Sequence, residues 1–249
     1  MIQIIPIRVS AEAGLYDDLN TMILEATSQD SQIQIQDGDI LVVTHKIISK
    51  IEGRIVDLAS VKPSAKAIRM AKEHDKDPRL IELVLKESTR ILRAKNGIII
   101  TETKHGFVCA NAGVDQSNVK GDTAVLLPVA PDRSARRLKD DMKKRTGREI
   151  AVIISDTFGR PFRNGQTNIA IGIAGIDPIK SYIGTCDMYG KKLRVSEIAI
   201  ADEIASAAEL VMGKSEGTPI AIIRGYNFER PARSSIKSLL RTRELDLFR

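Results

Sequence analysis

The sequence predicts an α+β fold in which mixed or antiparallel sheets are flanked by helices and two subdomains interlock. Segments typical of strands and of helices follow one another without the regular strand–helix alternation of a doubly wound sheet. Several apolar runs are nearly continuous, as expected of strands that are covered on both faces. The length of 249 residues suits one large domain or two interlocked subdomains, with a subdomain boundary expected near residues 128–133.

The N-terminal segment predicts a strand, a helix and a second strand. Residues 1–9 are mostly β-branched and apolar, and residues 15–28 place leucine and isoleucine at helical spacing. After a turn at residues 37–39, residues 40–50 are β-rich and apolar at first, which is typical of a buried strand. Residues 51–58 are expected to continue or return that strand.

Two helices are expected next, at residues 64–76 and 78–90. Ser64 and Asp77 are residue types that cap helix N-termini, and Pro78 suits a first helical position. Short strands then follow in a hairpin or meander, because Asn-Gly and His-Gly pairs separate them. These strands are residues 91–92, 97–103 and 107–110.

The C-terminal half predicts further strands around two helices. The expected strands are residues 123–127, 149–155, 179–185 and 219–224, and residues 168–175 fit either a strand or a helix. The expected helices are residues 134–147, which are basic, and 199–212, which end at Gly213, a natural helix terminator.

The composition indicates a globular protein with an anionic partner. Hydrophobic residues make up 43% and charged residues 28%, unlike a disordered or membrane protein. The net charge of +6 favours a nucleotide, a phosphorylated cofactor or nucleic acid. The chain start lacks the features of a signal peptide and no apolar run approaches the roughly 20 residues of a membrane span, so we expect a cytoplasmic protein without a membrane partner. Cys109 and Cys186 lack a metal-binding spacing, and both are expected to be buried.

Residues 44–54, THKIISKIEGR, contain a row of cations. Lys46, Lys50 and Arg54 recur every fourth residue, and on the expected strand this spacing places all three on one face. Two interpretations remain open, since such a row can bind a polyphosphate or can protect an edge strand from pairing with another chain.

Two acid-bearing turns each follow an expected buried strand, namely NAGVDQSN and SDTFGRPFRNGQTN. Asp115 in the first turn, and Asp156 with Thr157 in the second, offer the oxygen ligands that Mg²⁺ and Mn²⁺ prefer. Together the turns predict a metal site between them. The alternatives are an ordinary Asx-rich turn and a loop held by Arg–Asp pairs.

Arg160 and Arg163 flank the second turn, where either guanidinium can hold a phosphate or a carboxylate with two hydrogen bonds. Gly159 and Gly165 let the backbone approach a ligand closely. We therefore expect both arginines to contact an anionic ligand.

The segment GKSEGTPIAIIRG, residues 213–225, shares a Gly-Lys-Ser run with phosphate-binding loops. It is not a Walker loop, because Ala208 stands where that motif requires glycine and the segment follows a helix. It can bind phosphate through backbone amides and Lys214, with Glu216 available to a metal, or it can be a helix end followed by a turn.

Segments spread along nearly the whole chain resemble, in fixed order, the coenzyme F420-0:γ-glutamyl ligase family. They are IIPIR, DGDILVVTHKIISKIEGR, NAGVDQSN, SDTFGRPFRNGQTNIAIGIAG, YGKKL, ADEIASAAELVMGKSEGTPIAIIRG and a tail ending in DLFR. The resemblance implies a single ligase domain over residues 1–249 with a family-specific fold of intertwined α+β parts. It also implies a homodimer and no C-terminal flavin-reductase-like extension.

The same resemblance implies a GTP-dependent amide ligase of coenzyme F420 biosynthesis, which adds L-glutamate to F420-0 and then, through a γ-linkage, to F420-1. It implies two divalent cations, Mg²⁺ or Mn²⁺, with K⁺ as a further candidate cofactor. The implied GTP contacts are Ile5, Pro6, Ile7, Arg8, His45, Lys46, Lys50, Asn118, Lys214, Ser215, Glu216, Gly217, Thr218, Pro219, Ile220 and Ala221. The implied metal ligands are Asp115, Asp156, Thr157 and Glu216. Small polar residues are frequent in the family at the position of His45, so this residue is expected to contribute through its backbone.

The mechanism expected from these residues passes through an acyl phosphate and needs no covalent enzyme nucleophile. Asp115, Asp156, Lys46 and Lys50 are the expected catalytic residues, because the two acids hold divalent cations and the two lysines stabilise the charge that spreads over the transferred phosphoryl group. Arg160 and Arg163 are expected to contact the phosphate and carboxylates of the acceptor substrate. Two other functions remain open on the residues alone. A metal-dependent phosphohydrolase would use the same acids and cations, and a nucleic-acid-binding protein would use the positive charge, although aromatic residues make up only 4% of the chain.

Overall fold

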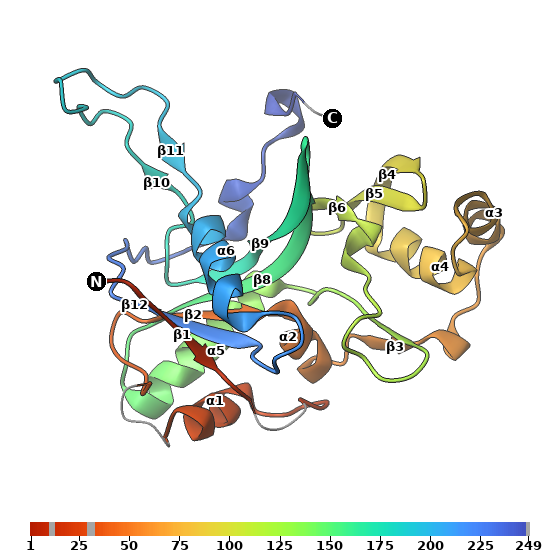
Figure 1. The fold of residues 1–249 in the computed structure, drawn as a ribbon, viewed down its shortest axis with the longest axis horizontal. Helices are drawn as coiled ribbons and strands as arrows, with labels where there is room; N and C mark the ends of the chain where they lie inside the picture. The colour runs from red at the N-terminus through yellow and green to blue at the C-terminus, as the bar shows by residue number, and fades with distance from the viewer. Residues whose placement is uncertain (10–12, 29–32, 248–249) are drawn as a thin grey trace.

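The computed structural model describes residues 1–9, 13–28 and 33–247 and is built around a five-stranded sheet (Figure 1). Its strand order is β1-β12-β2-β8-β9. The strands are β1 (Gln3–Ile7), β12 (Ile220–Arg224), β2 (Ile40–Thr44), β8 (Ala151–Arg160) and β9 (Arg163–Ala174). Strands β2 and β8 are parallel and the other neighbours are antiparallel, so the predicted α+β class with mixed sheets is confirmed.

Helices cover both faces of this sheet. In Figure 1, α6 (Ile200–Met212) lies in front of the sheet, while α5 (Pro131–Thr146) lies behind it and contacts α1 (Leu19–Ser28). The side chains of Ile40–Val43 in β2 and Ala151–Ile154 in β8 have no exposed surface. Burial on two faces explains why these strands are continuous apolar runs in the sequence.

Residues 55–126 form a second unit, here called the small lobe, to the right of the sheet in Figure 1. It contains α3 (Ala65–His74), α4 (Pro78–Glu87), the meander β4 (Ser88–Lys95), β5 (Ile98–Thr103) and β6 (Val108–Ala110), and the strand pair β3 (Ile55–Asp57) and β7 (Thr123–Val125). A separate cluster of buried apolar side chains, including Leu58, Ile81 and Ile99, fills this lobe.

The predicted helix caps of the small lobe are confirmed. The Ser64 hydroxyl accepts a hydrogen bond from Ala67 N, and the Asp77 carboxylate accepts one from Arg79 N. The second helix ends at Glu87, earlier than expected, because the following residues already pair with β5 as part of β4. Short 3-10 turns complete the described chain, at η1 (Leu58–Ser60), η2 (Asn111–Gly113), η3 (Ile236–Leu239) and η4 (Arg243–Leu245).

At the end of the small lobe the chain passes from one cluster of buried side chains to the other. Leu126 packs in the cluster of the small lobe, whereas Leu127 packs in the cluster around the main sheet. This point adjoins the boundary expected near residues 128–133, which stays a prediction about folding units.

The expected strand over residues 40–50 is wrong beyond Thr44, because the chain turns into helix α2 (His45–Ile51). Ile47, Ile48 and Ile51 repeat at the spacing of one helix face and pack against the main core. The isoleucines favour strand by propensity, and this packing of the apolar face overrides the propensity.

The expected turn over SDTFGRPFRNGQTN is also wrong, because most of it is the hairpin of β8 and β9. Asp156 pairs with Ile169, and Thr157 with Asn168, so the acid and the hydroxyl project from a strand. The reversal itself is confined to Pro161 and Phe162, between Arg160 and Arg163. The strand also resolves the open alternative for residues 168–175.

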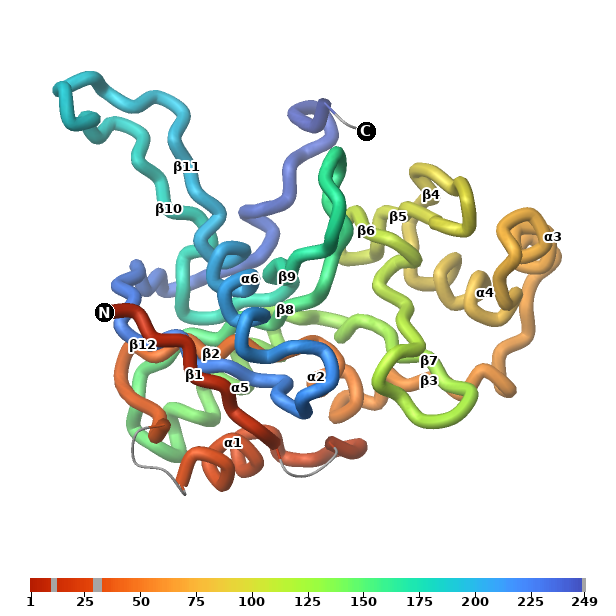
Figure 2. The backbone as a smooth tube through the Cα atoms, viewed as in Figure 1, coloured from red at the N-terminus to blue at the C-terminus, as the bar shows by residue number. Residues whose placement is uncertain are grey.

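The strand expected at residues 179–185 is reduced to β10 (Lys180–Ser181), which pairs with β11 (Glu197–Ile198). The two strands form the base of a protruding segment, residues 180–198, here called the arm, which leaves the sheet at the upper left of Figure 2. Cys186 in the arm is exposed, so its expected burial is wrong, while Cys109 is buried as expected. Burial, followed by the nearby charge of Asp156, raises the pKa of the Cys109 thiol to about 12.

The remaining boundaries agree with the sequence within a few residues. Helix α5 begins with Pro131 in its first turn, before the expected start at residue 134, and α6 ends at Gly213 as expected. Of the DLFR tail, residues 248–249 lie outside the described residues. In the described chain, no helix is long and apolar enough to cross a membrane.

Candidate functional site

A cavity of about 1080 Å³ opens where the adjacent ends of β2 and β8 meet α2, the loop after β6 and the loop after α6. Twelve of the residues predicted for the site line it, from all four of the motifs considered above. They are His45, Lys46, Lys50, Asp115, Asn118, Asp156, Thr157, Lys214, Ser215, Gly217, Thr218 and Pro219.

Helix α2 places the cationic pair at this cavity. Lys46 and Lys50 are four residues apart and therefore share one helix face. Arg54 does not join them, because it lies beyond the helix and its guanidinium contacts Glu87 at 2.6 Å and donates to Leu127 O at 2.9 Å. The predicted row of three cations is thus a pair, and its geometry comes from a helix instead of a strand.

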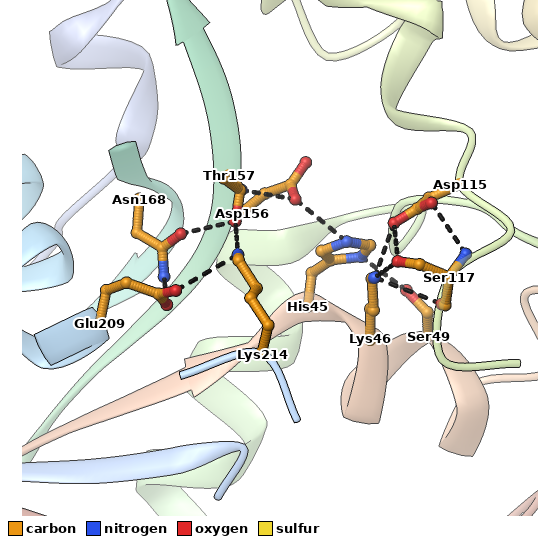
Figure 3. A network of polar contacts seen from close by, with 10 residues as sticks. All are labelled: His45, Lys46, Ser49, Asp115, Ser117, Asp156, Thr157, Asn168, Glu209 and Lys214. Atoms are coloured by element: carbon orange, nitrogen blue, oxygen red, sulfur yellow. Dashed lines mark hydrogen bonds and ion pairs between the residues drawn. The ribbon is translucent and has the colours of Figure 1, made fainter. Parts of the chain in front are cut away.

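Lys46 is bound to the first acid. Its Nζ lies 2.6 Å from Asp115 Oδ2 and donates to the carbonyl oxygen of Ser117, whose own backbone N and hydroxyl donate to Asp115 (Figure 3). Burial alone would raise the pKa of Asp115, but the hydrogen bonds from Lys46 and Ser117 outweigh it and hold this pKa below its usual value. Asp115 is therefore ionised at neutral pH.

His45 holds the second acid. Its Nε2 lies 3.2 Å from Asp156 Oδ1, and its Nδ1 lies 3.3 Å from the Ser49 hydroxyl one turn along α2. Asp156 Oδ1 also accepts a hydrogen bond of 2.7 Å from Thr157 N. His45 is 2% exposed, and its side chain, not only its backbone, is directed at the predicted site.

A second network surrounds Thr157, to the left of His45 in Figure 3. The Thr157 hydroxyl donates to Asn168 Oδ1 at 2.6 Å and accepts from Lys214 Nζ at 2.5 Å. Asn168 Nδ2 donates to Glu209 Oε2 at 2.7 Å, and Glu209 Oε1 lies 3.4 Å from Lys214 Nζ. The strand pairing of Thr157 with Asn168 brings these groups together.

Ser117 and Glu209 are members of these networks that are not among the residues predicted from the sequence. Ser117 stands inside the NAGVDQSN motif, next to residues that were selected. Glu209 is part of an otherwise small and apolar helix, where Asp202, Ser206 and Glu209 repeat at the spacing of one helix face. That repeat is the signal by which it could have been found.

The remaining predicted residues lie beside the cavity or away from it. Ile5–Ile7 and Ile220–Ala221 are brought together as neighbours because β1 pairs with β12, and Arg8 follows β1. Glu216 is not part of the cavity lining, and its carboxylate lies so close to Gly213 that a Cβ there would be 1.8 Å from Oε2. Gly213 has a φ of +59°, so both its backbone and this contact require glycine.

The two arginines of the hairpin lie at its tip, outside the cavity lining. Arg160 and Arg163 pair across the turn, and Arg160 Nη2 donates to Asn164 O at 2.8 Å. Their contact with an acceptor substrate stays a prediction.

The donors in the cavity suit a hard divalent cation. Asp115, Asp156 and Thr157 supply carboxylate and hydroxyl oxygens, and Ser155 Oγ and Asn111 Oδ1 are buried beside them without a hydrogen-bond partner. Within residues 1–9, 13–28 and 33–247, no three His, Cys, Asp or Glu side chains gather closely enough to hold a metal ion. A cation bound here would therefore complete its coordination with other oxygens, from water or from a bound phosphate.

Known proteins that are similar to this chain point to one family. The model of a family described as F420-0:Gamma-glutamyl ligase matches residues 13–225. A protein named Coenzyme F420:L-glutamate ligase from Methanothermobacter thermautotrophicus is 47% identical, over 95% of this chain and 94% of that protein. A protein of the same name from Methanocaldococcus jannaschii is 46% identical, over 88% of this chain and 88% of that protein. Another from Methanopyrus kandleri is 39% identical, over 100% of this chain and 98% of that protein.

Proposed function

Because this chain belongs to the F420-0:Gamma-glutamyl ligase family, we propose that it is a GTP-dependent ligase that joins L-glutamate to coenzyme F420-0 through an amide bond. The relatives named above are F420:L-glutamate ligases, and the proposal extends their activity to this chain. The observation that carries it is the convergence in one cavity of acids and lysines from distant motifs, namely Asp115, Asp156, Lys46, Lys50 and Lys214.

The proposed reaction has two steps. A carboxylate oxygen of F420-0 first attacks the γ-phosphorus of GTP, and the bond from this phosphorus to the β–γ bridging oxygen breaks, releasing GDP. The amine nitrogen of L-glutamate then attacks the acyl carbon of the resulting acyl phosphate. The bond from this carbon to the phosphate oxygen breaks, the nitrogen loses a proton, and an amide and inorganic phosphate remain. A second cycle would use the γ-carboxylate of the glutamate already added.

The protein contributes position and charge to both steps. Lys50 and Lys214 would bind the phosphates of GTP, while Lys46 and His45 keep the carboxylates of Asp115 and Asp156 in place. Asp115, Asp156 and Thr157 would hold a divalent cation, Mg²⁺ or Mn²⁺, which neutralises charge on the transferred phosphoryl group when bound. Arg160 and Arg163 would contact the anionic groups of F420-0.

Mass spectrometry of the product tests this function directly. F420-0 incubated with the protein, GTP, L-glutamate and Mn²⁺ should gain the mass of one or two glutamyl units, and GDP should form only when both F420-0 and glutamate are present. GDP formation without either substrate would instead identify a phosphohydrolase.

Lys50→Ala should weaken GTP binding about tenfold or more with little change in the fold, because it removes a positive charge from the wall of the phosphate-binding cavity. Titration calorimetry with GTP measures the affinity. Lys72→Ala, which removes an exposed lysine of α3 in the small lobe, is the matched control and should bind GTP normally. An unchanged affinity in Lys50→Ala would remove this residue from the GTP site.

We also propose that the active form is a homodimer to which the arm contributes. The arm exposes apolar side chains that a monomer leaves in water, since Met188, Tyr189 and Val195 are each more than 80% exposed. Light scattering of the protein should give the mass of two chains. A variant with all three residues changed to serine should shift towards one chain, and a monomeric wild-type protein would contradict the proposal.

A further inference from the structure

Helix α6 is fixed to strand β9 by three polar side chains on one of its faces. Asp202 accepts from Ala170 N at 2.9 Å, and Ser206 donates to Asn168 O at 2.7 Å. Glu209 accepts from the side chain of Asn168, a residue of β9 that lines the cavity. Because α6 leads straight into the loop that carries Lys214, these contacts also set where Lys214 lies relative to β8 and β9.

The carboxylate of Glu209 determines which way the Asn168 amide faces. Glu209 Oε2 accepts from Asn168 Nδ2 at 2.7 Å, so the NH₂ group of the amide faces the helix. The amide oxygen of Asn168 then faces Thr157, at 2.6 Å from its hydroxyl. An amide oxygen only accepts, and therefore the single hydroxyl hydrogen of Thr157 must be directed at Asn168.

The lone pairs of the Thr157 oxygen are therefore directed away from Asn168 and can interact with a cation. In this structure that cation is the Lys214 ammonium group, which donates to Thr157 Oγ1 at 2.5 Å. Asn168 is 2% exposed and is held through both its side-chain atoms and its backbone oxygen, so its amide does not turn freely.

We propose that Glu209 is a positioning residue, which acts through Asn168 to keep the Thr157 hydroxyl as an acceptor for a divalent cation in the cavity. The inference rests on the proposed function, in which Thr157 is a metal ligand. Without Glu209, the Asn168 amide can turn over and offer its NH₂ group to Thr157. The O–H bond of Thr157 can then rotate so that its hydrogen points into the cavity, where its partial positive charge repels a cation.

The test is Mn²⁺ binding to the enzyme without GTP or F420-0, measured as loss of the free-ion electron paramagnetic resonance signal. Glu209→Ala should weaken binding at least ~10-fold, the usual effect of losing a residue that orients a metal ligand. Glu209→Gln can still present an oxygen to Asn168 Nδ2, so its affinity should remain much closer to wild type although the negative charge is gone. This pair of variants separates the orientation of the amide from the charge of Glu209.

Asp202→Ala is the matched control, because it removes another acid that fixes α6 to β9 without touching Asn168 or Thr157 side chains. It should bind Mn²⁺ like wild type even if its thermal stability falls. Equal weakening in Asp202→Ala and Glu209→Ala would overturn the inference, since it would show a loss of helix anchoring alone.

A double-mutant cycle completes the test. Thr157→Val should lower the Mn²⁺ affinity, and Glu209→Ala should have little further effect in that background, because its action passes through the missing hydroxyl. Additive effects, or no effect of Glu209→Ala in the wild-type background, would overturn the inference while leaving the ligase proposal intact. A wild-type protein that forms glutamylated F420 but binds no Mn²⁺ would also overturn it, whereas failure of the ligase proposal appears separately as the absence of product.

Discussion

Asp156→Asn should lower kcat for glutamate ligation by at least ~10²-fold, the scale typical of losing one electrostatic contact to a transition state. The asparagine oxygen can still accept the hydrogen bond from Thr157 N and lie near His45 Nε2, so the local geometry is retained while the negative charge is lost. Steady-state rates at saturating GTP, F420-0 and glutamate measure the change. The melting temperature should remain within a few degrees of wild type.

The control for this variant is Asp141→Asn, an equivalent change on α5 outside the cavity, where Asp141 contacts Asn20 and Arg145. Its kcat should equal that of wild type. If Asp156→Asn ligates glutamate at a normal rate, Asp156 has no part in the mechanism, whatever its position in the cavity.

Asp39→Ala should lower the free energy of unfolding by about 3–5 kcal/mol, the usual result of removing one partner of a buried ion pair. Asp39 is 1% exposed, and its two oxygens accept from Arg224 Nε at 2.9 Å and Arg224 Nη2 at 2.8 Å. It also accepts from Gln36 N at 2.8 Å. The alanine variant therefore takes the carboxylate away from a largely buried guanidinium, which keeps its hydrogen bond to Gln34 O, and removes the acceptor of Gln36 N.

Urea unfolding measures this change, and Asp37→Ala is the matched control in the same turn. Asp37 pairs with Arg148 where both side chains are more than half exposed, so water replaces the lost contact and the unfolding midpoint should move little. Equal shifts in the two variants would show that the Asp39–Arg224 pair contributes no more than a surface contact.

Local signals predicted the helices of the small lobe and the strands of the core well. Ser64, Asp77 and Pro78 act within one helical turn, so their effect does not depend on the rest of the fold. Runs such as residues 40–43 are buried on both faces, which leaves an unambiguous apolar pattern.

The failures occurred where distant packing decides the conformation. Helix α2 is rich in isoleucine, and its apolar face has meaning only beside the core that it covers. Gly159 and Gly165 are typical turn residues, yet the hairpin of β8 and β9 accommodates both. Cys186 is exposed because the arm protrudes from the sheet. The residues around Cys186 do not indicate this protrusion.

The candidate site was predicted in part because functional side chains cluster in the sequence as well as in space. Asp115, Asp156 and Lys214 stand in conspicuous polar motifs, and the structure brings them to one cavity. Glu209 shares one face of an alanine-rich helix with Asp202 and Ser206, but only the register of β8 with β9 connects it to Thr157 through Asn168. Its relevance is a property of the tertiary structure.

The pairing of β1 with β12 has a consequence for how the protein is made. Gln3 pairs with Arg224, so the edge of the central sheet joins two strands that lie far apart in the sequence. During synthesis the small lobe and the hairpin of β8 and β9 can emerge and collapse first, while β1 has to wait unpaired for β12, which begins only at Ile220. Contacts of such high sequence separation slow folding, and they make the early strand a point where an unfinished chain can associate with others. Pro219 precedes β12 and lines the cavity, so this wall of the site is complete only once the chain has been translated past Pro219.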